Sequence, residues 1–190
     1  MIWVGSFKSL QSVLPEPNST DTPLAVHTWL RSEIGLITPL VDWLMSIIVG
    51  SRYVFGAEES VELALREALS NAMLHGNRLY GSKLVHVRCW CEYGKGMTIV
   101  VRDQGHGFDP NAVPDPLAFE NLRAEHGRGI HLMKIAMDEV SFAPGGTEVH
   151  MRKKGRKQET PPWRSHNEAA RPFVSRPSPG VRVVELHERP

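Results

Sequence analysis

Four short blocks rich in glycine and polar residues stand in a fixed order along the middle of this 190-residue chain. They constrain its fold more than any other feature. Each block alone occurs by chance in many chains of this size, but their order and spacing are hard to obtain by accident. Each one ends, begins or joins a segment of regular hydrophobic periodicity, so together they fit one site in one domain. The blocks read EALSNAMLHGN (67–77), DQGHG (103–107), GRGI (127–130) and GGT (145–147).

The hydrophobic pattern predicts one α/β domain over residues 23–155. Val26, Thr28 and Leu30 alternate with their neighbours, which predicts a first strand over 24–31. Thr38 followed by Pro39 is typical of the N-cap and first position of a helix. The further expected elements are a helix from Thr38 to about Ser51, a helix over 58–75 stopped by Gly76, strands over 85–91 and 97–102 joined by a glycine-containing turn, a loop or lid over 108–126 with a short helix at 117–124, a helix over 129–137, and strands over 139–142 and 148–152. They predict a two-layer α/β sandwich in which helices cover one face of a mixed or largely antiparallel sheet.

The two ends of the chain differ from this domain in composition. Residues 1–22 are rich in turn-forming residues and are expected to form a mobile extension. Residues 156–190 are rich in Pro, Arg and Ser, so we expect a mostly disordered basic tail, in which 181–186 forms a short strand on binding a partner. From residue 151 onward ten Lys or Arg and four Glu give +6, which leaves 12 basic and 17 acidic residues, or −5, in the first 150. The net negative charge of the first 150 residues gives no reason to expect nucleic-acid binding.

Cysteine usage and hydropathy favour a cytoplasmic protein that does not enter a membrane. Cys89 and Cys91 stand two apart in an expected strand, so they share a face and are not placed to bridge each other. Four zinc ligands at finger-like spacing do not occur around this pair and His86, which favours buried apolar cysteines over a zinc site. The most apolar stretch, 34–49, contains a proline and an aspartate and is too short to span a bilayer.

The first block places a polar stripe on an expected helix. Glu67, Ser70, Asn71, Leu74 and His75 recur at helical spacing beside the apolar face. A solvated helix face is one interpretation. The other rests on side-chain chemistry, because an Asn oxygen completes the shell of Mg²⁺, which takes few protein ligands beside phosphates and water. A carboxylate one turn earlier is then placed to orient a hydroxyl or water for attack on a phosphate.

The second block follows an apolar strand. Gly105 and Gly107 let the chain turn sharply, and Asp-x-Gly is a common turn in its own right. The functional interpretation is that the carboxylate of Asp103 accepts a hydrogen bond from the adenine amino group, where guanine has a keto oxygen. Two other phosphate-binding motifs do not fit these residues. No GxxxxGK[ST] string occurs, and Phe, Asp and Pro rather than a helix follow Gly107.

The third block opens directly onto an expected helix. Gly127, Arg128 and Gly129 therefore place free backbone N–H groups and the positive end of a helix dipole where they can face a phosphate. An ordinary glycine-rich loop is the alternative interpretation. The side chains of Arg128 and Lys134 are each long enough to reach a phosphate, although solvation on the helix surface suits Lys134 equally well.

The set of four blocks resembles the nucleotide site of the GHKL superfamily, which includes gyrase, Hsp90, histidine kinase and MutL ATPases. The segment HGRGIHLMKIAMDEV followed by GGTEV looks like the small bacterial anti-sigma-factor serine kinases. The resemblance covers roughly residues 23–153 and leaves both ends unexplained.

This resemblance implies ATP and Mg²⁺ as cofactors and a role for each matching residue. Glu67 would assist the attacking group, Asn71 would hold the metal ion, and Asp103 would select adenine with Thr147 as a second, water-linked contact. The other residues that the resemblance implies for ATP binding are His75, Gly105, Gly107, Gly127, Arg128, Gly129 and Ile130.

The function that the resemblance implies is that of a serine/threonine protein kinase acting as an anti-sigma factor. Such proteins bind a sigma factor or phosphorylate an antagonist protein on Ser or Thr, and we also consider a homodimer. One alternative is a binding module that uses ATP to order its lid without chemistry. Another is a detached histidine-kinase catalytic domain or a slow ATPase. No histidine stands in a helical hairpin typical of a phosphoacceptor, so the acceptor of any phosphoryl transfer is expected on another protein.

Overall fold

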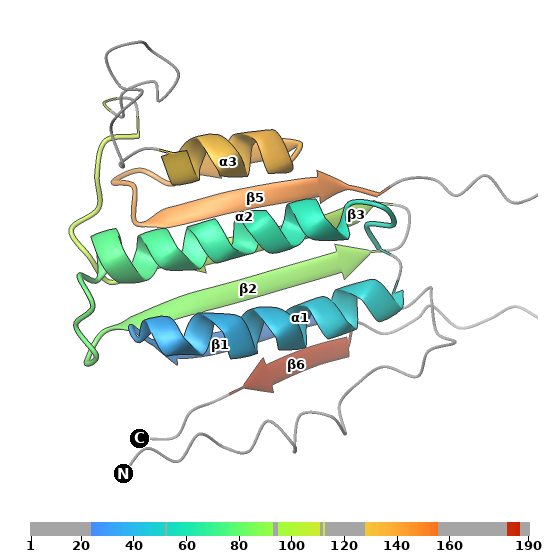
Figure 1. Ribbon diagram of the computed structural model, residues 1–190, viewed down its shortest axis with the longest axis horizontal. Coiled ribbons are helices and arrows are strands. Elements are labelled where there is room, and N and C mark those ends of the chain that lie inside the picture. The colour runs from blue at the N-terminus through green and yellow to red at the C-terminus, as the bar shows by residue number, and fades with distance from the viewer. Residues whose placement is uncertain are drawn as a thin grey trace, which may run out of the picture.

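The computed structural model describes residues 24–51, 53–92, 95–110, 112, 128–155 and 182–186, and within them the strands form one six-stranded sheet (Figure 1). The strand order is β4-β5-β3-β2-β1-β6. Neighbouring strands from β4 to β1 pair antiparallel, and β6 pairs parallel with β1. The strands are β1 Leu24–Arg31, β2 Leu84–Glu92, β3 Gly96–Arg102, β4 Glu139–Phe142, β5 Glu148–Lys154 and β6 Arg182–Leu186.

Helices cover one face of this sheet, as the hydrophobic pattern predicts. Figure 1 shows α1, α2 and α3 side by side in front of the strands, and α2 packs between the other two. None of the described helices is long and apolar enough to cross a membrane. The helical segments are the 3-10 turn η3 Ile34–Leu36, α1 Ile37–Ser51, α2 Glu58–Asn71, the π-helical turn η4 Ala72–Gly76 and α3 Arg128–Ala136.

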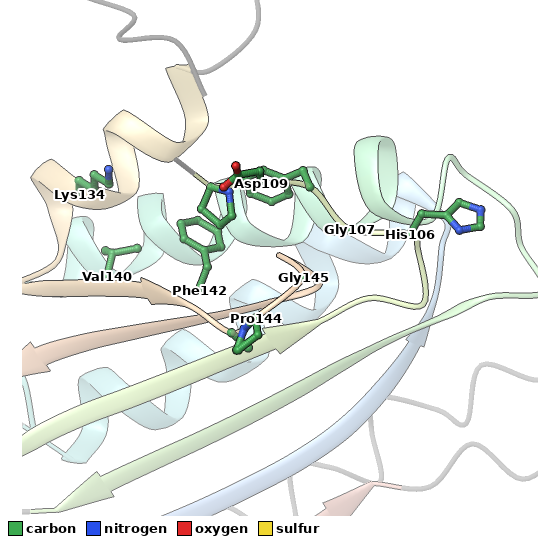
Figure 2. Close-up of a pocket in the computed structure, with 11 residues that line it drawn as sticks. His106, Gly107, Asp109, Lys134, Val140, Phe142, Pro144 and Gly145 are labelled. Carbon is green, nitrogen blue, oxygen red and sulfur yellow. The ribbon is translucent and has the colours of Figure 1, made fainter. Parts of the chain in front are cut away.

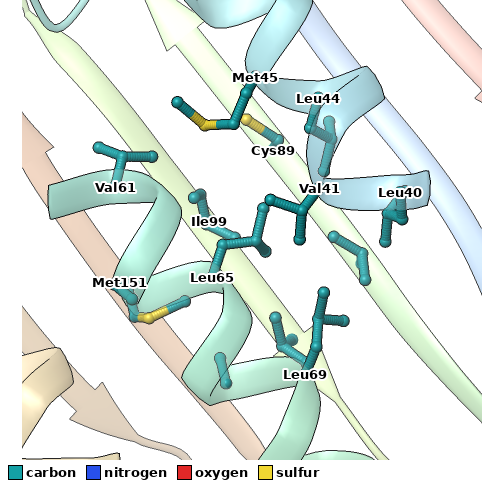
Figure 3. Packing of buried hydrophobic residues seen from close by; sticks show 14 of the residues in the cluster. Leu40, Val41, Leu44, Met45, Val61, Leu65, Leu69, Cys89, Ile99 and Met151 are labelled. Atoms are coloured by element: carbon teal, nitrogen blue, oxygen red, sulfur yellow. The ribbon is translucent and has the colours of Figure 1, made fainter. Parts of the chain in front are cut away.

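The core lies between the helices and the sheet. Leu65 and Leu69 of α2 meet Val41 of α1 above Ile99 of β3 (Figure 3), and all four are at most 1% exposed. Burying one such side chain contributes about 1.5–3 kcal/mol of transfer free energy. Buried and more exposed side chains alternate along β2, because every second residue from Val85 to Cys91 faces the helices. Packing of this core holds α2 against the sheet.

The cysteines take the buried positions that the sequence favours. Cys89 and Cys91 are free thiols, 2% exposed, with their Sγ atoms 3.5 Å apart on the helix-covered face. The hydrogen bond to Cys89, together with burial, raises the pKa of the Cys91 thiol well above its usual range. His86 lies on the opposite face of β2, where its ring stacks on Trp29 at 3.8 Å. The three side chains therefore cannot share one metal ion.

The predicted start of the first helix is wrong. The helix begins at Ile37, directly after η3, so Thr38 lies inside its first turn instead of at its N-cap. The Thr38 hydroxyl instead accepts a hydrogen bond from Nη1 of Arg66 on α2, at 3.2 Å. Pro39 remains in the first turn, where a helix leaves backbone N–H groups unpaired in any case. A contact between two helices thus decides the side-chain partner of Thr38.

One part of the predicted C-terminal tail lies in the sheet. Strand β6 lies within the short strand expected over 181–186, and it pairs with β1 from Leu24–Arg182 to Thr28–Leu186. Parallel pairing to an edge strand is a long-range contact that local composition does not reveal. The expected short helix at 117–124 and the expected extension at 1–22 lie outside the described residues.

Candidate functional site

The first and third blocks meet where α2 and α3 pack together. Glu67 and Asn71 lie one turn apart on α2, and Gly129 lies in the first turn of α3. A Cβ atom at Gly129 would stand 2.7 Å from Oε2 of Glu67 and 3.0 Å from Nδ2 of Asn71. Because glycine has no side chain, the start of α3 lies directly against the acidic and amide groups.

The end of the helical region meets the second block. A Cβ atom at Gly76 would stand 2.6 Å from Oδ2 of Asp103, and one at Gly105 would overlap the Gly76 carbonyl. The Gly105 N–H donates to Oδ1 of Asp103 at 2.7 Å. The π-helical turn ends at Gly76 as predicted, but that glycine does not adopt the left-handed conformation of a helix C-cap. It is required for the close approach of the Asp103 carboxylate.

The second and fourth blocks interlock. The Asp103 N–H donates to the Thr147 carbonyl at 3.0 Å, and the Phe108 N–H donates to the Gly145 carbonyl at 3.1 Å. Gly107 has φ +73°, and a Cβ atom there would overlap the Gly145 carbonyl and stand 3.0 Å from Cγ2 of Thr147. Two backbone hydrogen bonds and one left-handed glycine therefore hold the two loops against each other.

Asp103 has an unusual electrostatic environment. Burial raises the pKa of its carboxyl, and this effect outweighs the hydrogen bonds from the Gly105 and Asp103 N–H groups and the cationic charges of Lys83 and Arg102, which act in the opposite direction. A carboxylate removed from water gains more from a new hydrogen-bond donor than a solvated one does. The arrangement therefore suits a ligand that presents an amino group to this position.

The family model for the histidine kinase-like ATPase domain matches residues 30–153, which is more than half of the chain. The chain belongs to this family. A comparison with curated proteins found no match. The antiparallel strands β1 to β5 with helices on one face agree with the GHKL-type fold predicted from the four blocks. As an ATPase domain of this family, it binds ATP.

Other predicted site residues of the ATPase domain take different positions. Arg128 is exposed at the start of α3, whereas Ile130 packs against the hydrophobic core, so only its backbone is available to a nucleotide. His75 is exposed within η4. Because the π-helical turn follows α2, His75 does not continue the α-helical stripe of Glu67 and Asn71. Gly127 lies outside the described residues.

A hollow of about 740 Å³ lies beside the second and fourth blocks, where His106, Gly107 and Gly145 line it (Figure 2). It runs along Phe108, Asp109 and Pro110 and is bounded on the other side by the β4–β5 region and by Lys134 of α3. Of the predicted site residues that the structure describes, Gly107 alone lines it. Phe108 meets Phe142 edge to face at 5.4 Å. The sequence reasoning missed both aromatics, although an aromatic directly after the DxGxG block was a usable signal.

Proposed function

We propose that this ATP-binding domain is a serine/threonine protein kinase that acts as an anti-sigma factor and phosphorylates an antagonist protein. The observation that carries the proposal is the contact of Gly129 with both Glu67 and Asn71. It brings a carboxylate, an amide oxygen and a helix N-terminus to one point, which is the combination that phosphoryl transfer uses. The HGRGIHLMKIAMDEV segment, similar to anti-sigma-factor kinases, supports the choice of protein substrate.

The donor set at α2 fits the magnesium ion that such a domain uses. Asn71 would hold the ion through its amide oxygen, which agrees with the preference of Mg²⁺ for few protein ligands. When bound, the ion neutralises charge on the phosphates. The backbone N–H groups at the start of α3 would hold the phosphate oxygens, and the carboxylate of Asp103 would accept a hydrogen bond from the adenine amino group.

In the proposed reaction Glu67 acts on the acceptor. The hydroxyl oxygen of a Ser or Thr on the antagonist attacks the γ-phosphorus of ATP, and the bond from that phosphorus to the β–γ bridging oxygen breaks. ADP leaves, and the hydroxyl proton passes to the Glu67 carboxylate. Because the acceptor belongs to another protein, transfer switches the partner that the kinase holds, which is either the sigma factor or the antagonist.

The test compares Glu67→Gln with Asn71→Ala. Glu67→Gln is expected to keep ATP binding while labelled-phosphate transfer to the antagonist falls by about 10²–10⁴-fold, as for a lost general base. Asn71→Ala is expected to impair Mg²⁺-dependent binding and transfer together. Glu59→Gln makes the same chemical change at an exposed position in the first turn of α2 and serves as the matched control.

Candidate antagonists are the proteins encoded beside this one, and a pull-down with and without ATP identifies further partners. Binding of ATP and of a partner by the wild-type protein, without transfer to any Ser or Thr, would leave an ATP-ordered binding module. Release of free phosphate in the absence of an acceptor would indicate a slow ATPase of the histidine-kinase type.

A further inference from the structure

Asn77, directly after η4, is a fully buried polar residue with a partner on each side of its amide. Its exposed fraction is 0%. Oδ1 accepts a hydrogen bond from the Gln104 N–H at 2.8 Å, and Nδ2 donates to Oγ of Ser32 at 2.7 Å and to the Leu84 carbonyl at 3.0 Å. A buried amide with these partners is rigid, because any rotation leaves a buried polar group unpaired.

These hydrogen bonds join four separate segments. Asn77 ends the helical region, Ser32 follows β1, Leu84 begins β2, and Gln104 lies in the loop after β3. Gln104 is held a second time, since its Oε1 accepts a hydrogen bond from the Leu84 N–H at 2.8 Å. The residue that follows Asp103 is therefore fixed by both its backbone and its side chain.

The backbone around Asn77 has an irregular path that brings its side chain to this position. The Asn77 N–H donates to the Ala72 carbonyl, five residues earlier, at 2.8 Å, and this widens the last helical turn. Arg78 and Leu79 then have φ of +54° and +58°. Two successive left-handed residues that carry a Cβ atom are disfavoured and persist only where the surroundings determine them. Irregularities of this kind concentrate at functional sites.

We propose that Asn77 is a positioning residue for adenine recognition. By holding the Gln104 N–H it keeps the Asp103 carboxylate against Gly76 at the end of the helical region. Since Asn71 lies six residues earlier in the same region, Asn77 also sets the separation between the base-selecting and metal-holding groups. This inference rests on the proposed role of Asp103, and it adds the residue that determines where that carboxylate points.

The experiment measures ATP and inosine triphosphate affinities by calorimetry, with the full chain and Mg²⁺. Inosine triphosphate carries a keto oxygen where adenine carries its amino group. For Asn77→Ala we expect the preference for ATP over inosine triphosphate to fall by about tenfold, the loss of one well-placed hydrogen bond to a charged group. Thr28→Ala, a substitution at another buried polar position of the sheet, is expected to lower the melting temperature and leave the preference unchanged.

A double-mutant cycle separates positioning from general damage. In an Asp103→Ala background, Asn77→Ala is expected to change ATP affinity by less than about twofold, because the group it positions has been removed. The inference would be overturned if the fold-losses of ATP affinity from the two substitutions multiply in the double mutant. An unchanged nucleotide preference in Asn77→Ala would also overturn it. If Asn77→Ala does not fold, Ser32→Ala removes one hydrogen bond from the same amide and must shift the preference in the same direction. Failure of the wild-type protein to prefer ATP would instead remove the proposed role of Asp103.

Discussion

The two ends of the candidate site are held in place by different forces. At the end formed by Asp103, Gly105 and Gly107, hydrogen bonds and close backbone contacts fix the loop. At the end formed by Glu67 and Asn71, the packing of α2 against α3 brings the side chains to Gly129. Backbone contacts cannot yield, whereas the ends of long side chains can. The end around Asp103 is therefore already organised in the free protein, and the end around Glu67 and Asn71 is able to adjust to a ligand.

The largest expected effect separates the glycines of the two ends. Gly107→Ala places a Cβ atom on the Gly145 carbonyl at φ +73° and is expected to reduce the free energy of unfolding by about 2–4 kcal/mol. Gly129→Ala meets only the ends of two side chains and gains about 1 kcal/mol of helix propensity. Its stability is expected to change little, while its ATP affinity falls.

Denaturant unfolding and calorimetry on both variants check this pair. Equal loss of stability in the two variants, or normal ATP binding by Gly129→Ala, would remove the distinction between a rigid and an adjustable end.

An intermediate effect separates the chemistry of the two ends. Asp103→Ala is expected to weaken ATP binding by about tenfold to over a hundredfold, the cost of one hydrogen bond to a charged group, with or without Mg²⁺. Asn71→Ala is expected to remove only the part of the affinity that depends on Mg²⁺. Titrations at several Mg²⁺ concentrations measure both. A magnesium dependence that is lost in Asp103→Ala and kept in Asn71→Ala would reverse the assignment.

The smallest expected effect concerns the pH dependence of stability. Burial raises the pKa of Asp103 from its ordinary value of 3.8, so the unfolded chain loses this proton at lower pH than the folded chain does. Stability from this group is therefore present below pH 3.8 and is lost as pH rises through the raised pKa. Asp103→Asn removes that loss. Melting temperatures of both proteins between pH 3 and 7 should diverge with rising pH in favour of the variant, and parallel curves would contradict the assigned burial.

Elements whose residues interact within a short stretch were predictable. The first strand and β4 have the predicted bounds, and the hairpin from β2 to β3 follows the alternation of Val85 to Cys91 and the glycine turn after it. The four blocks could be found for the same reason, because each is a short run of characteristic residue types. The N-cap role of Thr38 was not predicted correctly and the pairing of β6 with β1 was not predicted, because Arg66 and β1 supply the partners from distant positions.

By itself the sequence determined the sheet-and-helix alternation, the family and the candidate residues for the proposed Mg²⁺ and ATP site, because periodicity and side-chain chemistry are local properties. Only the tertiary structure decided that Gly76 serves the approach of Asp103, that Phe108 and Lys134 line one hollow, and that Asn77 connects four segments. The hydrogen bonds from Asn77 to Gln104 and to Ser32 join residues 27 and 45 positions apart. Packing of the whole core determines such long-range contacts, and a short stretch of sequence does not reveal them.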